Sequence, residues 1–395
     1  MIPQNIERRI RQHIQAGKHI FFAIVQPGFE ETALQEILCK DVQLSDIKIT
    51  EGGIEFSAGI KDIWELNFTS GCLTRILMRI GVFKALYFEK FREKIESVPW
   101  ELYLKPEQTP GFSIKCRHSR LYHTGRIEEE CGKGILSRME KVYPATAREE
   151  SSEVNRPTVY VRFEDDICTV SIDTTGEPLY RRGFRTHIAK APMRETLASC
   201  ILREAGVEKF DALLDPMCGS GVIPLEGALI SRGIPAGMCR YFAFEDWPGH
   251  REKAFNYLKK KIIKKSKSGS TGFAVYASDI DEKAVETARY NFGTSGIAGD
   301  VEISCSDFFS LKRKDFPEEK LLIAFNPPYG ERIGLKDVTQ LYRQIGIKLR
   351  SGFSGSVCAV IVPGIKAEKA LGISPIKRIQ FINGGIRVAL VIGLC

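Results

Sequence analysis

The chain has 395 residues, of which 43% are hydrophobic and 27% are charged, so wholesale disorder is excluded and two or three domains are expected. A formal net charge of +8 allows a polyanionic partner but does not identify one. The sequence has no run of about eighteen apolar residues, and its first twenty residues contain no continuous apolar stretch, which argues against a membrane helix and a secretory signal.

The first half predicts a compact α+β region in which strands and helices alternate. β-rich apolar runs predict strands at 19–25, 53–56, 112–116, 159–163 and 167–172. Apolar residues at helical spacing predict helices at 30–38, 60–70 and 127–142. The last two strands are expected to form a hairpin around residues 164–166.

The second half changes to a repeated order of strand, turn and helix. Short apolar runs predict strands at 211–214, 273–278, 301–304, 321–325 and 356–362, with 387–394 as a closing edge strand. Helical spacing appears at 222–230, 282–292 and 337–349. This order predicts a Rossmann-like, doubly wound α/β domain, which binds its ligand at the carboxyl ends of its strands.

A glycine turn, Asp215 to Gly221 (DPMCGSG), follows the first strand of this half and precedes a helix. Gly219 and Gly221 allow unusual backbone angles and close approach of a ligand, and Asp215 can accept a hydrogen bond from a ligand's ammonium group. By its sequence alone, the turn could also be a tight connection without a ligand, although a ligand-binding turn is favoured. It is not a Walker A loop, because no Lys-Ser/Thr pair follows.

Two further strands end in acidic residues. Asp279 stands where a carboxylate can bind the two hydroxyls of a ribose. Asp281 is better explained as the N-cap of the next helix. Asp307 can accept from an adenine amino group while Phe308 packs on the ring, although a helix cap beside core aromatics explains this pair equally well.

The segment Asn326-Pro327-Pro328-Tyr329 follows the fourth strand. The amide oxygen of Asn326 and the carbonyl of Pro327 are two acceptors that the prolines hold in place. Two acceptors can bind the hydrogens of an –NH₂ group and orient its lone pair toward an electrophile. Tyr329 offers a ring on which an extruded base can stack.

Four motifs in order, DPMCGSG, SDID, SDFF and NPPYGER, resemble the amino-methyltransferases that act on N2 of guanine or N6 of adenine. The bacterial large-subunit rRNA guanine-N2 methyltransferases are similar over longer stretches, namely NPPYGERIG, DTTGEPLYRRGFR (173–185), APMRETLA (191–198) and FAFEDWP (242–248). In that family, a ferredoxin-like segment and a THUMP RNA-binding domain precede the catalytic domain, and residues 19–38 and 112–135 resemble parts of these. Some members carry a second methyltransferase domain downstream, for which 395 residues leave no room.

The resemblance implies a domain order of ferredoxin-like segment (1–60), THUMP-like RNA-binding domain (61–175), linker (176–189) and S-adenosylmethionine-dependent methyltransferase domain (190–395). It implies a cofactor site formed by Asp215, Cys218, Gly219, Gly221, Asp279, Asp307, Phe308, Pro192 and Thr196. It implies that Asn326 and Pro327 hold the target amine and that Tyr329 stacks on the base.

Two arginine groups are candidate RNA contacts, although exposed charge without a function explains them as well. They are Arg117, Arg120 and Arg126, which lie near Tyr122 and His123, and the cluster Arg181, Arg182 and Arg185. Eleven cysteines without a C-x-x-C pair favour a cytoplasmic protein with no disulfide framework and no metal site. We expect a monomer that binds RNA and does not bind a membrane.

The sequence therefore predicts transfer of a methyl group from S-adenosylmethionine to the N2 amine of a guanine in large-subunit (23S-type) rRNA. A tRNA guanine-N2 methyltransferase shares the same features and remains an alternative. N6-adenine methylation of RNA, glutamine methylation of a protein and a non-catalytic RNA-binding protein are further alternatives. A redox dinucleotide enzyme is disfavoured, because D-x-x-x-G-x-G is not G-x-G-x-x-G.

Overall fold

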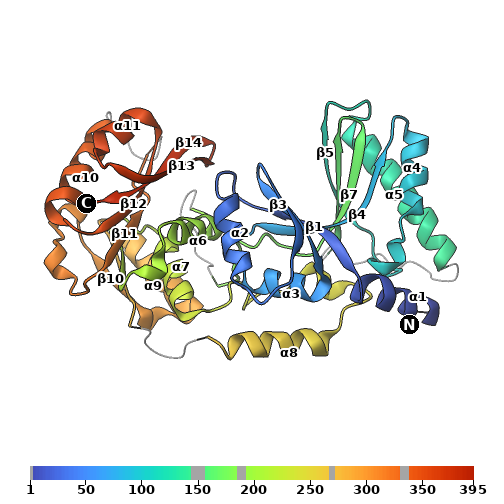
Figure 1. Ribbon diagram of the computed structural model, residues 1–395, viewed down its shortest axis with the longest axis horizontal. Coiled ribbons are helices and arrows are strands. Elements are labelled where there is room, and N and C mark those ends of the chain that lie inside the picture. The colour runs from blue at the N-terminus through green and yellow to red at the C-terminus, as the bar shows by residue number, and fades with distance from the viewer. Residues whose placement is uncertain (1–2, 144–155, 185–192, 267–271, 330–337) are drawn as a thin grey trace.

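A computed structural model describes residues 3–143, 156–184, 193–266, 272–329 and 338–395. Two lobes are each built on a seven-stranded sheet, and they are joined by residues 176–184, here called the connector. The N-terminal lobe ends at residue 175, and the C-terminal lobe begins at residue 193. Figure 1 shows the lobes side by side, with helix α8 of the C-terminal lobe running beneath the N-terminal lobe.

The N-terminal sheet has the strand order β2-β3-β1-β4-β7-β6-β5. Its strands are β1 Lys18–Ile24, β2 Ser45–Thr50, β3 Gly53–Gly59, β4 Arg75–Lys84, β5 Gly111–Arg117, β6 Thr158–Glu164 and β7 Ile167–Asp173. Its helices are α1 Gln4–Ile10, α2 Glu30–Leu38, α3 Ile60–Thr69, α4 Phe88–Ser97 and α5 Thr124–Val142. All neighbouring strands are antiparallel except β5 and β6.

Strand β4 pairs with β1 on one side and with β7 on the other, so one sheet continues across the predicted domain boundary at residue 60. The predicted hairpin around residues 164–166 is confirmed, since β6 and β7 pair from Glu164↔Ile167 onward. Its turn residues Asp165 and Asp166 both have positive φ, which matches the right-handed twist of the paired strands and which aspartate tolerates.

The C-terminal sheet has the strand order β10-β9-β8-β11-β12-β14-β13. Its strands are β8 Ala212–Asp215, β9 Ala274–Asp279, β10 Val301–Cys305, β11 Leu321–Phe325, β12 Val357–Val362, β13 Pro375–Asn383 and β14 Ile386–Leu394. Its helices are α6 Glu195–Glu204, α7 Val222–Arg232, α8 Glu252–Ile263, α9 Glu282–Ser295, α10 Val338–Gly352 and α11 Gly364–Leu371. The first five strands in the order are parallel to one another, and β14 is antiparallel to both of its neighbours, β12 and β13.

This sheet confirms the predicted doubly wound domain, and strand β11 (LLIAF) is buried along its whole length, as a central strand covered on both faces should be. The prediction of 387–394 as an edge strand is wrong. Strand β14 lies between β12 and β13, and the edge strand is β13. Because most side chains of β13 are exposed, its sequence PIKRIQFIN carries no pattern of alternating buried residues.

The lobes share a continuous hydrophobic core, so the domains are packed rather than loosely tethered. Helix α8 inserts Phe255, which is 1% exposed, against Trp64 and Phe68 of α3. The connector buries Leu179, Arg182 and Phe184 instead of forming an exposed linker.

A buried carboxylate, Glu36, lies between helices of the two lobes. Glu36 of α2 accepts from the Ser70 hydroxyl at 2.7 Å and the Gly71 amide at 2.7 Å, and it pairs with Arg203 of α6 at 3.2 Å. Burial alone would raise the pKa of Glu36, but the charges of Arg203 and Lys40 and these hydrogen bonds lower it to about 2. Because this pKa lies below the ordinary value of 4.5, the folded protein stabilises the ionised form of Glu36.

We predict that Glu36→Gln lowers the free energy of unfolding by about 3 kcal/mol at neutral pH, which corresponds to this depressed pKa. Because the folded pKa lies below the unfolded pKa, the contribution is present above pH 4.5 and is lost as the pH falls toward 2. Urea unfolding of both proteins at several pH values measures the difference. The exposed Glu208→Gln is the control, and a Glu36→Gln deficit that stays constant with pH would contradict the prediction.

Candidate active site

The glycine turn and the Asn-Pro-Pro-Tyr segment meet at one crevice. The strand order reverses between β8 and β11, which pair in parallel from Ala212↔Leu321 to Leu214↔Ile323. Asp215 ends β8 and Asn326 directly follows β11. The carboxyl ends of two adjacent strands at such a reversal form the usual ligand crevice of an open α/β sheet.

The two glycines of the turn have different reasons to be glycine. Both have positive φ, +54° at Gly219 and +81° at Gly221. A Cβ on Gly221 would lie 2.7 Å from the Phe292 ring, so this position serves the packing of α9. A Cβ on Gly219 would meet no atom of the described residues within 4 Å, so the backbone there leaves room in which a ligand can lie.

Asp215 is 2% exposed, and its carboxylate accepts from the Met217 amide at 3.1 Å. Burial raises the pKa of Asp215 well above its ordinary value, and the charge of Asp279 raises it further. No ion pair to Asp215 is found among the described residues. A buried carboxylate without a cation suits a ligand that brings an ammonium group, because the ligand supplies the missing charge.

Asp279 and Cys218 hold the turn against the neighbouring strand. One carboxylate oxygen of Asp279 accepts from the Gly219 amide at 2.8 Å, and the Cys218 amide donates to the Ser278 carbonyl at 2.9 Å. Burial raises the pKa of the Cys218 thiol, so this side chain acts as a small apolar group. The N-cap role predicted for Asp281 is confirmed by its bond from the Lys283 amide at 3.0 Å.

Asp307 caps a short 3-10 turn (Phe308–Ser310) and accepts from the Phe309 amide at 3.0 Å. The ring of Phe308 is 2% exposed and packs on Phe325 and Phe353. The prediction that Phe308 contacts an adenine is therefore not met in this structure, because its ring is a core side chain. The exposed ring beside Asp307 belongs to Phe309, which the motif alone could not distinguish from its neighbour.

Asn326 has an unusual environment. Its side-chain oxygen is buried and accepts no hydrogen bond from the residues that the structure describes, although buried polar atoms are almost always paired. Pro327, which follows it, is buried as well. An unpaired acceptor at the crevice is suited to bind an amino group, because an N–H of the ligand would supply the missing hydrogen bond.

Tyr329 is not placed as the sequence predicts. It is 3% exposed, so its ring offers no face to a base in this structure, and this stacking prediction is corrected. The phenol oxygen accepts from the Asn383 amide, at the end of β13, at 2.7 Å. Sequence reasoning missed Asn383, because its neighbours in the chain do not mark a partner 54 residues away.

The segment predicted to cover the cofactor is described in part. Pro192 lies outside the described residues. Thr196 is 2% exposed in α6, which packs against α7, the helix that follows the glycine turn. This position is next to the glycine turn's helix, so Thr196 remains a predicted cofactor-binding residue.

The first arginine group is gathered at one end of the N-terminal sheet and remains accessible. Arg120 lies over the Tyr87 ring at 5.7 Å and Arg126 over the Phe88 ring at 4.1 Å. The side chain of Arg117 is 69% exposed and lies 3.9 Å from Glu164. These contacts leave guanidinium edges available for phosphates, so the predicted RNA contact remains a prediction.

The second arginine group is divided. Arg181 is exposed and pairs with Glu177 at 2.8 Å, and Arg185 lies outside the described residues. The prediction that Arg182 binds RNA is wrong. Its side chain is fully buried and forms a two-pronged ion pair with Glu226, at 3.0 and 3.1 Å, so it cannot reach a phosphate.

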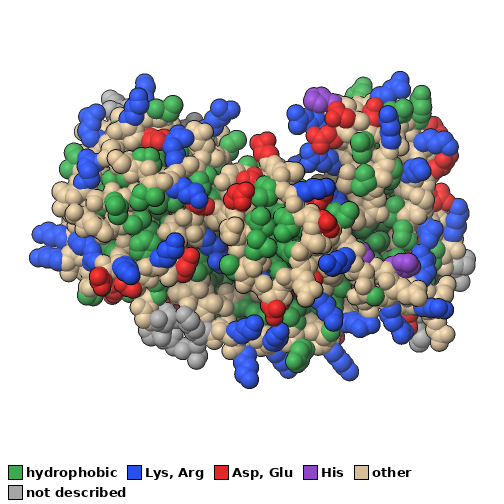
Figure 2. All heavy atoms as spheres, viewed as in Figure 1, with side chains coloured by type: hydrophobic (Ala, Val, Ile, Leu, Met, Phe, Trp, Pro, Cys, Tyr) green, Lys and Arg blue, Asp and Glu red, His purple; other side chains and the backbone are tan. Residues whose placement is uncertain are grey.

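Charge by itself does not locate an RNA site. Figure 2 shows Lys and Arg side chains spread over this face of the molecule, with many along the lower edge, where α8 lies. Among the described residues, no group of three His, Cys, Asp or Glu side chains could hold a metal ion. Nor does any described helix have the length and apolar character needed to cross a membrane.

Comparison with protein families gives two matches. Residues 182–392 match the RMKL-like methyltransferase domain, and residues 20–77 match the RlmL ferredoxin-like domain. The chain is 28% identical over 380 residues to the ribosomal RNA large subunit methyltransferase K/L of Syntrophotalea carbinolica, covering 94% of this chain and 53% of that protein. The chain thus spans about half the length of the curated large-subunit methyltransferases that it matches first.

Two solved structures match over nearly their whole length. A possible methylase from Clostridium difficile 630 is 27% identical with a TM-score of 0.83, covering 96% of this chain and 98% of that one. A protein described as a predicted N6-adenine-specific DNA methylase, from Listeria monocytogenes, is 25% identical with a TM-score of 0.83, covering 95% of this chain and 96% of that one. Both lobes of this chain therefore recur together in these proteins.

Proposed function

Because the chain belongs to the family of RMKL-like methyltransferase domains, we propose that it methylates the exocyclic N2 amine of a guanine in large-subunit rRNA. The observation that carries the proposal is the buried side-chain oxygen of Asn326, which lies at the sheet's crevice without a partner among the described residues. The ribosomal RNA methyltransferases that the chain resembles support RNA as the substrate. The motif resemblance supports guanine N2 as the acceptor.

The cofactor is S-adenosylmethionine, which supplies the methyl group from its sulfonium, so that the bond to sulfur breaks as the bond to nitrogen forms. The crevice fits this molecule, because Asp215 has no cation beside it in the described part of the chain and Gly219 leaves room beside the backbone. We assign the ammonium group to Asp215, the ribose hydroxyls to Asp279 and the adenine amino group to Asp307. We also assign Thr196 and Cys218 to the cofactor site.

The residues of the chain contribute positioning rather than an activated nucleophile. The Asn326 side-chain oxygen and the Pro327 carbonyl accept the two hydrogens of the target amine. These bonds favour the tetrahedral nitrogen that develops during transfer, whose lone pair is no longer delocalised into the ring. The methylated nitrogen becomes acidic and releases one proton afterwards, so no general base is needed before transfer.

Methyl transfer from labelled S-adenosylmethionine to naked rRNA, assembled large subunits and bulk tRNA, followed by nucleoside analysis, tests the proposal. We expect labelled N2-methylguanosine from large-subunit rRNA. The same nucleoside from tRNA alone would make the chain a tRNA methyltransferase. Labelled N6-methyladenosine would show that the target base is adenine rather than guanine, in line with the description of the Listeria protein as a predicted N6-adenine-specific DNA methylase.

Three predictions about the whole protein remain proposals. We assign RNA binding to a THUMP-like domain at residues 61–175, where Arg117, Arg120 and Arg126 are accessible. We propose that the protein is cytoplasmic and that it is a monomer.

The raised pKa of Asp215 predicts that cofactor binding depends on pH. In the free protein the carboxyl tends to keep its proton, whereas the ammonium group of a ligand favours the carboxylate. Binding should therefore release a proton, and affinity should rise with pH from the ordinary range of an aspartate until the raised pKa is passed.

Calorimetric titration with S-adenosylhomocysteine in two buffers of different ionisation enthalpy measures this release directly. The expected result is up to one proton released per ligand, falling to zero at high pH. The Asp215→Asn variant is the control and should bind weakly without proton release. Binding to the native protein without any proton release would show that Asp215 is already ionised or lies away from the ligand.

A further inference from the structure

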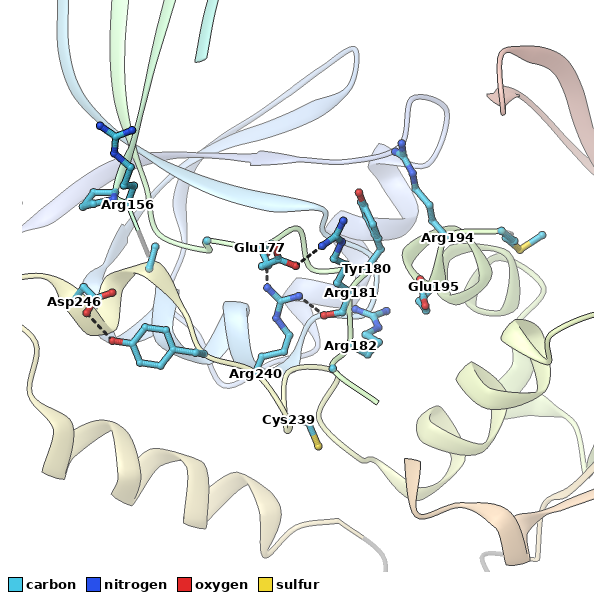
Figure 3. A pocket seen from close by; sticks show the side chains of 16 residues that line it. Arg156, Glu177, Tyr180, Arg181, Arg182, Arg194, Glu195, Cys239, Arg240 and Asp246 are labelled. Carbon is cyan, nitrogen blue, oxygen red and sulfur yellow. Dashed lines mark hydrogen bonds and ion pairs between the residues drawn. The ribbon is translucent and has the colours of Figure 1, made fainter. Parts of the chain in front are cut away.

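A cavity of about 640 Å³ lies between the two lobes, and none of the cofactor residues assigned above lines it. Its walls come from the residues preceding β6, from the connector, from the start of α6 and from residues 239–246. Figure 3 shows Arg156 at one end and Arg194 at the other, with Glu177, Tyr180 and Arg181 between them. Both lobes thus contribute to one space large enough for a nucleotide but not for a duplex.

The cavity carries more positive than negative charge. Five arginines line it, against three carboxylates, and these residues are Arg156, Arg181, Arg182, Arg194, Arg240, Glu177, Glu195 and Asp246. The charge of Arg182 is already neutralised by Glu226 outside the cavity, and Arg181 is paired with Glu177. Arg156, Arg194 and Arg240 form no ion pair among the described residues. The pair of Arg181 with Glu177 is exposed, so an entering anion can take the place of that carboxylate.

Arg240 provides a fixed positive charge at the connector. Its guanidinium donates to the carbonyls of Glu177, Pro178 and Arg181, and it forms no ion pair among the described residues. Its Nε atom is buried and finds no acceptor in the part of the chain that the structure describes. Burial and the neighbouring charge of Arg182 lower the pKa of Arg240 to about 10, so the site favours any anion that enters.

Arg194 lies at the mouth of the cavity. Its guanidinium lies over the Tyr180 ring, 5.0 Å from the ring centre, and it makes no hydrogen bond or ion pair with the described residues. This cation–π contact keeps the guanidinium group beside the ring. Its N–H edge is available, and that planar fork matches the oxygens of a phosphate.

We propose that this cavity binds a backbone phosphate of a single-stranded segment of the substrate RNA, with Arg194 and Arg181 as its ligands. The proposal rests on the proposed function and adds a contact near the crevice, because the cavity wall continues into α6, which carries Thr196. A strand bound here contacts the N-terminal lobe and the C-terminal lobe together. Arg240 contributes charge without contacting the strand, because its two terminal nitrogens donate to carbonyls of the connector and its Nε is buried.

The test compares Arg194→Gln and Arg181→Gln with the native protein. The probe is a fluorescein-labelled, single-stranded RNA of about 12 nucleotides, and its Kd is measured between about 50 and 200 mM salt. We expect each variant to bind several-fold more weakly and to lose about 0.7 from the slope of log Kd against log salt, as one phosphate contact predicts for a single strand. Arg11→Gln is the matched control, because Arg11 and Glu7 form an exposed pair at the same spacing as Arg181 and Glu177.

A second variant changes binding in the opposite direction. Glu177→Gln removes the carboxylate that competes for Arg181, so it should bind the same RNA more tightly than the native protein. If this gain is absent and the slopes of both arginine variants equal that of Arg11→Gln, the cavity is not a phosphate site. That result leaves methylation by the native protein intact, so the proposed function stands; a native protein that neither binds nor methylates RNA overturns both.

Discussion

Replacing Asn326 with alanine is expected to lower the kcat of methyl transfer by about 100- to 1,000-fold while cofactor affinity stays near that of the native protein. The physical reason is the buried oxygen of Asn326, which has no partner among the described residues and can accept an N–H of the target amine. The loss is of the size seen when one preorganised polar group is removed from a transition state. Initial rates at saturating RNA, with S-adenosylhomocysteine titration alongside, measure both parts.

Asn326→Asp provides the comparison that separates this role from a loss of fold. It keeps an acceptor oxygen at the same place, so it should recover at least part of the rate that the alanine variant loses. Both variants should bind the cofactor, because Asp215 and the glycine turn are unchanged. Near-native turnover in Asn326→Ala would show that this oxygen does not hold the amine.

The second large effect concerns stability rather than chemistry. Arg182→Ala should lower the free energy of unfolding by about 3–5 kcal/mol, because it leaves the Glu226 carboxylate buried without its counter-charge. The guanidinium also donates to the Leu179 carbonyl at 3.0 Å and the Gly71 carbonyl at 2.8 Å. It therefore joins the connector, α7 and the N-terminal lobe at one buried point. Chemical denaturation followed by circular dichroism measures the loss.

A double variant tests the mechanism of this loss. Arg182→Met with Glu226→Met removes both charges and keeps apolar volume, so it should be clearly more stable than Arg182→Ala. Its RNA affinity should have the native salt dependence, since a buried arginine contacts no phosphate. An Arg182→Ala protein of native stability, with a reduced salt slope, would restore the RNA-binding role that the sequence predicts.

Arg181 and Arg182 show that neighbouring residues of the same type can have different roles. Arg181 and Arg182 are adjacent and chemically identical, and the sequence predicts both as RNA contacts. In the structure one is exposed and the other is fully buried, because Glu226 stands 44 residues away on α7. Pairing over such a distance leaves no local signal.

The sequence by itself determined the fold of the second half and the order of its candidate site. Apolar runs separated by helical periodicity predict a parallel sheet, and a polar motif after each central strand predicts one crevice, since parallel strands end at the same edge. Local turn chemistry likewise predicted the β6–β7 hairpin, where two aspartates take positive φ. These features depend on residues close together in the chain.

Only the tertiary structure decided which of these side chains are available. Phe308 and Tyr329 belong to motifs that predict ligand contacts, yet both are buried, one among core aromatics and one beside Asn383. The position of β14 inside the sheet and the arginine-lined cavity between the lobes also depend on packing between distant segments. Hydrophobic periodicity predicts which side chains of an element are buried on average. It does not predict which distant residues bury them, because those contacts depend on how the elements pack.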